Sequence, residues 1–319
     1  MDFFHSLAFG LIALAIVGGS WCICGLVMGS APKRGVSSAA VQRISAVISC
    51  LVSAVVLLAT QTGISDIGAK AVFWTCASYF AAAVVNTCML QVMSMAMQRG
   101  PNGIIWCIIQ SAMLFPFLAG VLFFQVQAGW LQGLGVGMLL AALILFGLGK
   151  DNTVRAENQK SGVLGWKTLA FLAFLITGLQ QNLATMPSYF EASRHVSSVL
   201  RTLCTSIGTL LTTIVWSFFK GEPCPFFFSR DTLRNRYFWG YAIAMQGFGL
   251  LAAYFLLYPG LDILAENGLG GMGYPLMVGS CIVSFTLASI FLLRERFQWK
   301  QAVAVVLCLA GLVALCWKG

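Results

Sequence analysis

The chain has 319 residues, of which 59% are hydrophobic and only 9% are charged, and its formal net charge is +9 at pH 7. Soluble domains average roughly 45–50% apolar and about 25% charged residues, so this composition excludes a soluble protein of this length. The basic residues form no run of the kind that binds nucleic acid, and we expect them to mark cytoplasmic loops instead. The chain is therefore predicted to be an all-α integral membrane protein that lies in a lipid bilayer, with no nucleic-acid partner.

The sequence carries no recognisable catalytic or metal-binding motif. It lacks HExxH, GxSxG and nucleotide-binding loops, and it has only two histidines, His5 and His195. No CxxC pair is present, and most of the 11 cysteines lie in apolar stretches, where they act as small hydrophobic residues. We therefore expect no enzyme activity, no cofactor and no bound metal.

Uncharged stretches of about 20 residues locate the membrane spans. We predict ten of them, in chain order: 6–28, 39–61, 71–97, 103–124, 130–149, 167–186, 196–219, 236–258, 270–293 and 299–317. The eighth span either ends near 258 or continues to 266.

Lysine and arginine placement predicts the orientation. Fourteen of the 19 basic residues fall in loops after odd-numbered spans, three fall on the opposite side, and Arg43 and Arg201 lie near span ends. The positive-inside rule then places the odd-span loops in the cytoplasm and both termini outside. We expect a multi-pass protein of the cell membrane, specifically the bacterial inner membrane.

An internal repeat is visible when each residue is compared with the one 169 positions later. Nine identities occur over the 39 positions 111–149, including Trp130 with Trp299 and Gln132 with Gln301. A repeat unit of five helices has an odd number of membrane crossings. The second copy therefore enters the membrane from the opposite face, as in inverted-repeat transporters. We predict a first repeat over 1–150, a cytoplasmic connecting loop over 151–166 and a second repeat over 167–319.

Two motifs near the C-terminus carry a family resemblance. Gly-Leu-Gly-Gly (268–271) precedes the ninth span, and Leu-Leu-Arg-Glu-Arg-Phe-Gln-Trp-Lys-Gln (292–301) joins the last two spans. With Glu295, Trp299 and Gln301 in place, the chain resembles the EamA-like ten-helix branch of the drug/metabolite transporter superfamily. The first half departs from the pattern, because Val126 stands where the acidic turn residue is expected.

The resemblance implies ten transmembrane helices arranged as two inverted five-helix repeats around a central cavity. Spans 1, 3, 4, 6, 8 and 9 are expected to line the cavity, with contributions from spans 2 and 7, and spans 5 and 10 are expected at the periphery. Gly129, Gly133 and Gly137 on span 5 form a small-residue stripe. We favour internal packing for this stripe, with a homodimer through helices 5 and 10 as the alternative.

Uncharged polar and aromatic residues inside the spans are the candidates for a substrate cavity, because lipid cannot satisfy their hydrogen bonds. They are Trp21, Asn86, Gln91, Gln110, Ser111, Gln180, Gln181, Asn182, Gln246, Tyr254, Tyr274 and Ser280. Their amide and hydroxyl groups suit a small polar or amphipathic solute. Each one taken alone is also explained by helix packing.

Ionisable residues at membrane depth are costly and so are functional candidates. Asp262 and Glu266 follow Pro259 and lie one helical turn apart if the eighth span continues; Asp262 is then the candidate for proton coupling, and otherwise both lie in a solvated loop. Arg43 and Arg201 either face the cavity or extend to the membrane interface as anchors.

The sequence therefore predicts a secondary transporter of a small-molecule substrate, with proton coupling as an option and alternating access as the mechanism. The alternative is a receptor or scaffold that keeps the transporter fold and moves nothing.

Overall fold

The computed structural model describes residues 6–60, 68–100, 102–149, 165–220, 228–247, 252–291 and 299–317, and the regular elements in these ranges are all helices. The first half contains α1 (Leu7–Ser30), η2 (Pro32–Arg34), α2 (Ser38–Thr60), α3 (Ala69–Met97), α4 (Asn102–Gln110), η3 (Ser111–Met113), α5 (Leu114–Phe123) and α6 (Trp130–Gly149). The second half contains α7 (Trp166–Thr185), η4 (Met186–Tyr189), α8 (Glu191–Arg194), α9 (Ser198–Phe219), α10 (Arg230–Arg234), α11 (Arg236–Gly247), η5 (Ala252–Leu257), α13 (Tyr258–Glu266), η6 (Gly270–Met272), α14 (Gly273–Phe291) and α15 (Trp299–Cys316).

Six stretches in the described part are long and apolar enough to cross a membrane. They are Leu7–Ser30, Ser38–Thr60, Ala69–Met97, Ile104–Phe123, Trp166–Tyr189 and Ser198–Phe219. Their outer faces carry large apolar side chains, such as Leu58, Phe123 and Phe219, which are 79%, 78% and 86% exposed. Side chains of this kind suit contact with lipid, so the protein fits a multi-pass membrane protein.

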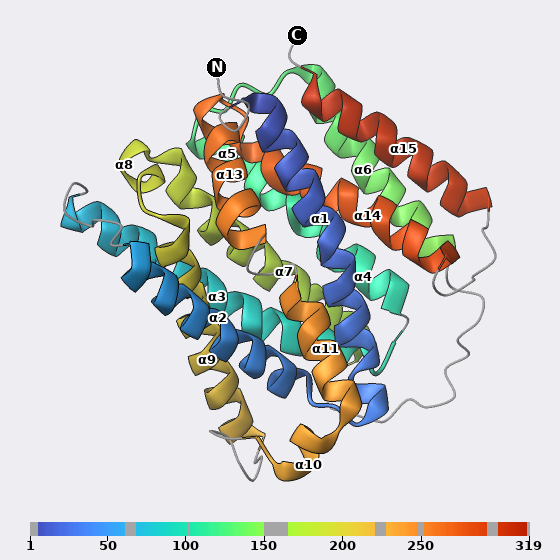
Figure 1. The fold of residues 1–319 in the computed structure, drawn as a ribbon. Coiled ribbons are helices and arrows are strands. Elements are labelled where there is room, and N and C mark those ends of the chain that lie inside the picture. The colour runs from blue at the N-terminus through green and yellow to red at the C-terminus, as the bar shows by residue number, and fades with distance from the viewer. Residues whose placement is uncertain are drawn as a thin grey trace.

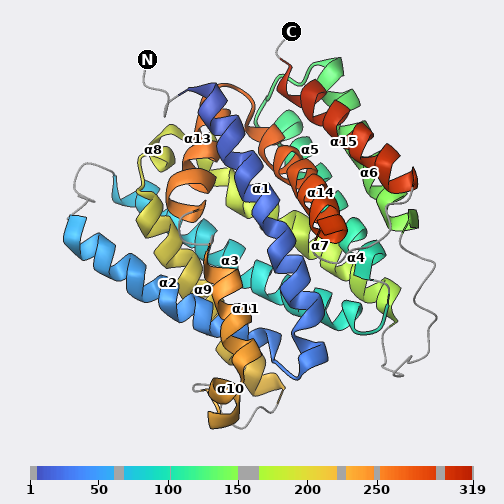
Figure 2. The same cartoon turned by 45° about the vertical axis from the view of Figure 1, so that its right-hand side comes forward.

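The helices pack in a bundle whose neighbours come from both halves of the chain. α1 lies against α14, α3 lies between α7 and α9, and α2 packs on α9. α6 and α15 form a pair at one edge of the molecule, and α2 and α9 lie at the other edge, as Figures 1 and 2 both show. The start of α1 and the end of α15 lie at the same end of the bundle (Figure 1).

Local sequence signals explain where several helices begin and end. Ser6 and Ser197 cap α1 and α9 by accepting hydrogen bonds from the backbone N–H groups of Phe9 and Leu200. α13 ends at Glu266, and two residues later Gly268 has a φ of +72°, a left-handed conformation that favours glycine. Gly268 therefore forms part of the turn that follows α13.

In its described residues, 236–247 and 252–266, the eighth predicted span is helical, but it is not one regular helix. α11 ends at Gly247, η5 is a π-helix, and α13 begins at Tyr258 with Pro259 in its first turn. Proline is tolerated in a first turn, where its missing N–H has no helical partner. Asp262 and Glu266 therefore lie on a helix, and the solvated-loop alternative does not hold for Asp262, which is half-buried.

The glycine stripe on α6 does not make the internal contact that we favoured. A Cβ atom added to Gly133 or Gly137 would meet nothing within 4 Å, and both residues are exposed. α6 instead approaches α15 through Gly135, where an added Cβ would lie 2.8 Å from the carbonyl oxygen of Gly311. Internal packing therefore uses a different face of α6, and the predicted stripe lies on the outside.

Candidate substrate cavity and its ion-pair network

A cavity of about 270 Å³ lies inside the bundle. Its lining comes from α1, α3, α4, α7, α9, η5, α13 and α14. In the predicted numbering these are spans 1, 3, 4, 6, 7, 8 and 9. No described residue of α2, α6 or α15 contributes to the lining. The cavity therefore lies between helices of the two halves.

Aromatic rings from five different places surround the cavity. Trp21 of α1 lies 5.7 Å from Tyr274 of α14, measured between ring centroids, with the planes inclined by 41°. Tyr79 of α3 and Tyr258 of α13 meet edge to face at 4.9 Å. Trp106 of α4 completes the set, and its ring lies against Gly25, where an added Cβ would approach it to 3.0 Å. These rings give the cavity flat apolar walls.

Side-chain amides supply most of the cavity's hydrogen-bonding capacity. Asn86 lies on α3, Gln110 on α4, and Gln180 and Gln181 on α7. Gln181 is 2% exposed, and its Oε1 atom has no hydrogen-bond partner in the structure. A buried acceptor without a donor is unfavourable, and the fully covered Oε1 atom leaves this amide incompletely satisfied.

None of the described lining residues is charged at neutral pH. Among the 22 lining residues, the polar ones are amides, threonines and tyrosines. The hydroxyl of Thr177 donates to the carbonyl oxygen of Ala173, and that of Thr205 donates to the carbonyl oxygen of Thr202.

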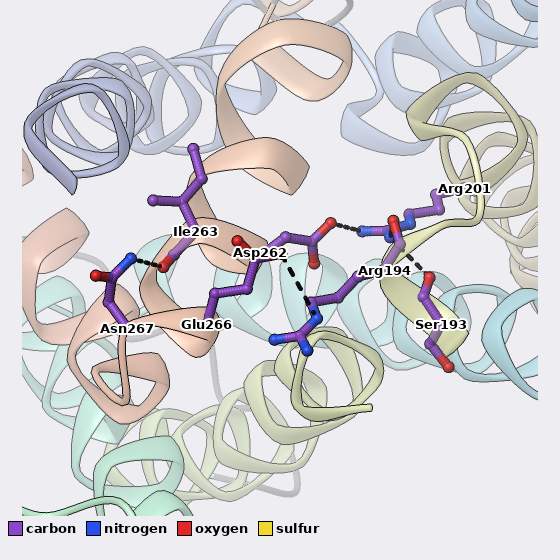
Figure 3. A network of polar contacts seen from close by, with 7 residues as sticks. All are labelled: Ser193, Arg194, Arg201, Asp262, Ile263, Glu266 and Asn267. Carbon is purple, nitrogen blue, oxygen red and sulfur yellow. Dashed lines mark hydrogen bonds and ion pairs between the residues drawn. The ribbon is translucent and has the colours of Figure 1, made fainter. Parts of the chain in front are cut away.

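A buried ion pair joins α9 to α13, as Figure 3 shows. Arg201 of α9 donates from Nη1 to Oδ2 of Asp262 on α13 at 2.8 Å. Its Nη2 donates to the backbone carbonyl oxygens of Ser193 and Arg194 at 2.8 and 2.9 Å. The side chains of Arg201 and Asp262 are 1% and 14% exposed. This charge-assisted contact is shielded from water and is supported by the hydrogen bonds to α8. It therefore holds α8, α9 and α13 together.

The second ion pair of this network is weaker. Nε of Arg194 lies 3.8 Å from Oε1 of Glu266, and the Glu266 side chain is 55% exposed. Water screens such a contact, so it contributes little stability. α13 therefore presents one acid inside the protein and one at the surface.

Two aromatic rings separate the buried ion pair from the cavity. The Cζ atom of Arg201 lies 5.7 Å from the ring centroids of both Tyr79 and Tyr258. Both tyrosines line the cavity, whereas Arg201 and Asp262 do not. The arginine thus interacts with the two rings and with the carboxylate at once.

The second candidate arginine is also buried. Arg43 of α2 is 2% exposed and donates to the Ser217 hydroxyl and to the carbonyl oxygen of Thr213, both on α9. Its Cζ lies 5.9 Å from the ring centroid of Phe228. Neither Arg43 nor Arg201 extends to the surface, so the interface-anchor alternative does not fit either residue.

Six of the twelve predicted cavity residues line this cavity: Trp21, Asn86, Gln110, Gln180, Gln181 and Tyr274.

Three of the others lie away from the lining. Gln91 accepts a hydrogen bond from Ser38 of α2 at 3.1 Å. Gln246 of α11 donates to the Ser49 hydroxyl at 2.7 Å. Ser280 is half-buried on α14 and is not among the lining residues. The first two amides tie α2 to neighbouring helices.

Two more predicted residues bond to their own helices. The Ser111 hydroxyl donates to the carbonyl oxygen of Ile108, and the Asn182 amide donates to that of Gly178. The side chain of Tyr254 lies outside the residues that the structure describes. The polar groups of Ser111 and Asn182 are therefore satisfied locally.

Sequence reasoning missed several residues that define the cavity. Tyr79, Trp106, Tyr258, Thr205 and Thr209 all line it. Aromatic and threonine side chains are common on membrane helices, so type alone does not distinguish cavity from lipid. The burial of Tyr79 and Tyr258 follows from their contact with each other, which no local pattern predicts.

Comparison with known proteins adds information about the fold only. The sequence matches no protein-family model and no curated protein. A solved structure, described only as the crystal structure of a protein, is similar with a TM-score of 0.62 and 13% identity. The similarity covers 96% of this chain and 96% of that chain. The helical arrangement therefore has a counterpart among solved structures along almost the whole chain.

Proposed function

We propose that this protein is a secondary transporter that moves a small polar or amphipathic metabolite by alternating access. The observation that carries the proposal is the cavity between the two halves of the chain, with its aromatic walls and its unpartnered Gln181 acceptor. Concave sites with apolar walls and a few placed polar groups are the usual form of small-molecule sites. Transporters place such sites between repeats.

We further propose a ten-helix inverted repeat. The five helices α1, α2, α3, α4–α5 and α6 would correspond in order to α7, α9, α11–α13, α14 and α15. If each helix is replaced by its counterpart in the other repeat, the contact of α1 with α14 becomes a contact of α7 with α4. In the same way, the contact of α3 with α7 becomes a contact of α13 with α1. All four contacts are present. The α2–α9 and α6–α15 contacts map onto themselves. This pattern supports the repeat, as does the start of α6 and α15 at Trp130 and Trp299.

In this proposal the ion pair of Arg201 and Asp262 acts from behind the two tyrosine rings that line the cavity. It joins α9 to α13, and α13 lies near the end of the bundle where the chain termini lie (Figure 1). Protonation of Asp262 would remove the charge that holds Arg201. The pair is therefore our candidate for coupling solute movement to protons, in a bacterial inner membrane with both termini outside.

Reconstitution in liposomes tests the transport function. The purified protein is expected to accelerate uptake of one class of radiolabelled small metabolite. Gln181→Leu, which removes the cavity amide, should reduce that uptake. Gln246→Leu is a matched control because Gln246 contacts Ser49 rather than the cavity, and it should retain uptake.

Two results would contradict the proposal. Solute binding without uptake would favour the receptor alternative. Equal loss of uptake in both variants would mean that the cavity amide has no special role.

A further inference from the structure

We infer that the cavity binds an uncharged, flat nitrogen heterocycle of the nucleobase or nucleoside class. This inference rests on the proposed function and names its substrate class. It follows from three properties of the lining: its charge, its aromatic surfaces and its hydrogen-bonding groups.

The charge of the lining disfavours an ionic ligand. No described lining residue is charged at neutral pH, so a carboxylate, phosphate or ammonium group would lose its hydration without gaining a counter-ion. The closest described ion pair is internally compensated, because Arg201 is bonded to Asp262 at 2.8 Å. A neutral ligand carries no such penalty.

The position of Arg201 also argues against a cationic ligand held by aromatic rings. Tyr79 and Tyr258 each already have the Arg201 guanidinium 5.7 Å from the ring centroid. A second cation at these rings would meet a like charge. The rings remain suited to a neutral aromatic ligand, whose face or edge can pack on them.

The shape and composition of the lining favour a flat ring over a sugar. Fifteen of the 22 lining residues have aromatic, aliphatic or sulfur-containing side chains. A free sugar would place hydroxyl groups against these surfaces without partners. The volume of about 270 Å³ lies near the low end of ligand sites, which run from roughly 300 to 1,000 Å³. A single base or nucleoside suits this size better than a peptide or a lipid.

The amides supply the pairing that a heterocycle requires. Asn and Gln side chains both donate and accept, and they pair in two-bond contacts with base edges. Gln181 has an unpartnered buried Oε1, which needs an N–H donor. Asn86 and Gln110 line the same cavity from α3 and α4. Gln180 lines it from α7, and its side chain is hydrogen-bonded to Tyr274. Exocyclic amino groups, ring nitrogens and carbonyl oxygens of a base match this set.

Thermal unfolding of the purified full-length protein tests the inference with defined probes. Adenosine and uridine are expected to raise the melting temperature in a concentration-dependent way. Adenosine monophosphate, choline, glucose and glutamate should not. Gln181→Leu should weaken nucleoside binding by roughly tenfold, the loss expected for one hydrogen bond. Gln246→Leu should bind as the wild type does.

The outcomes separate this inference from the proposed function. Stabilisation by choline, glucose or glutamate, lost in Gln181→Leu, would overturn the heterocycle class and leave the transporter proposal standing. Adenosine monophosphate binding as tightly as adenosine would overturn the uncharged class. No stabilisation by either nucleoside would also overturn the inference. Absence of uptake for every solute in liposomes would overturn the proposed function itself.

Discussion

At the residue scale, the four ionisable candidates divide into different environments. Arg201 and Asp262 form one buried pair although they are 61 positions apart in the sequence. Glu266 is exposed one turn after Asp262. The cost of charge at membrane depth is what made these residues candidates in the sequence. Their pairing depends on how α9 and α13 pack, which no local pattern contains.

Removing the carboxylate of the buried pair should destabilise the protein. Asp262→Asn keeps the shape but leaves the Arg201 cation without its counter-ion, which typically costs about 3–5 kcal/mol for a buried pair. We expect a clearly lower melting temperature. Glu266→Gln is the matched control on the same helix, and it should have little effect because Glu266 is exposed. Equal melting temperatures for wild type and Asp262→Asn would contradict this assignment.

The same substitution tests proton coupling in a separate assay. If protonation of Asp262 releases Arg201, uptake into liposomes should vary with pH in the wild type. Uptake by Asp262→Asn should be nearly independent of pH, because the asparagine cannot titrate. An unchanged pH profile in the variant would exclude Asp262 as the coupling acid.

At the element scale, close contact between helices depends on single glycines. An added Cβ at Gly18 of α1 would lie 2.1 Å from the carbonyl oxygen of Met277 on α14. Sequence spacing suggested Gly129, Gly133 and Gly137 instead. Their regular spacing is visible in the sequence, but the rotation of α6 that points them outward is not. The small-residue pattern therefore identified α6 as a helix suited to close packing. It predicted the face with Gly133 and Gly137, whereas the packed face contains Gly135.

Substitution of these glycines should separate the two faces. Gly18→Ala is expected to push α1 away from α14 and to destabilise the protein by about 1–3 kcal/mol. Gly137→Ala meets nothing within 4 Å and gains about 1 kcal/mol of helix propensity. Thermal unfolding should therefore show a decrease for Gly18→Ala only. Similar decreases in both variants would mean that the two faces are equally packed.

At the scale of the whole molecule, hydrophobic stretches predicted helix positions well. The predicted span 130–149 corresponds to α6, and 196–219 differs from α9 by two residues at its start. The change from the π-helix η5 to α13 was only partly visible, through Pro259. The cavity could be predicted in part, because amides such as Gln181 must be shielded from lipid. Tyr79 and Trp106 could not be identified, since aromatic residues serve lipid-facing and buried positions alike.

The charge distribution predicts which end of the molecule faces the cytoplasm. α10, with Arg230 and Arg234, lies at the end opposite to the start of α1 and the end of α15 (Figures 1 and 2). A reporter that is active only in the cytoplasm, fused after Gly319, should therefore be inactive. The same reporter inserted within the 151–166 loop should be active. An active C-terminal fusion would contradict the predicted orientation.

The short helix α13 contacts both the cavity and the ion pair. Tyr258 and Leu261 line the cavity, and the next residue, Asp262, bonds to Arg201. A nine-residue helix is about 13 Å long, and η5 and Gly268 separate it from the regular helices on either side. It can therefore move as one rigid unit. By thermodynamic linkage, a solute whose binding changes the stability of the ion pair is itself affected by the ion pair. Breaking the pair then changes the free energy of solute binding by the same amount.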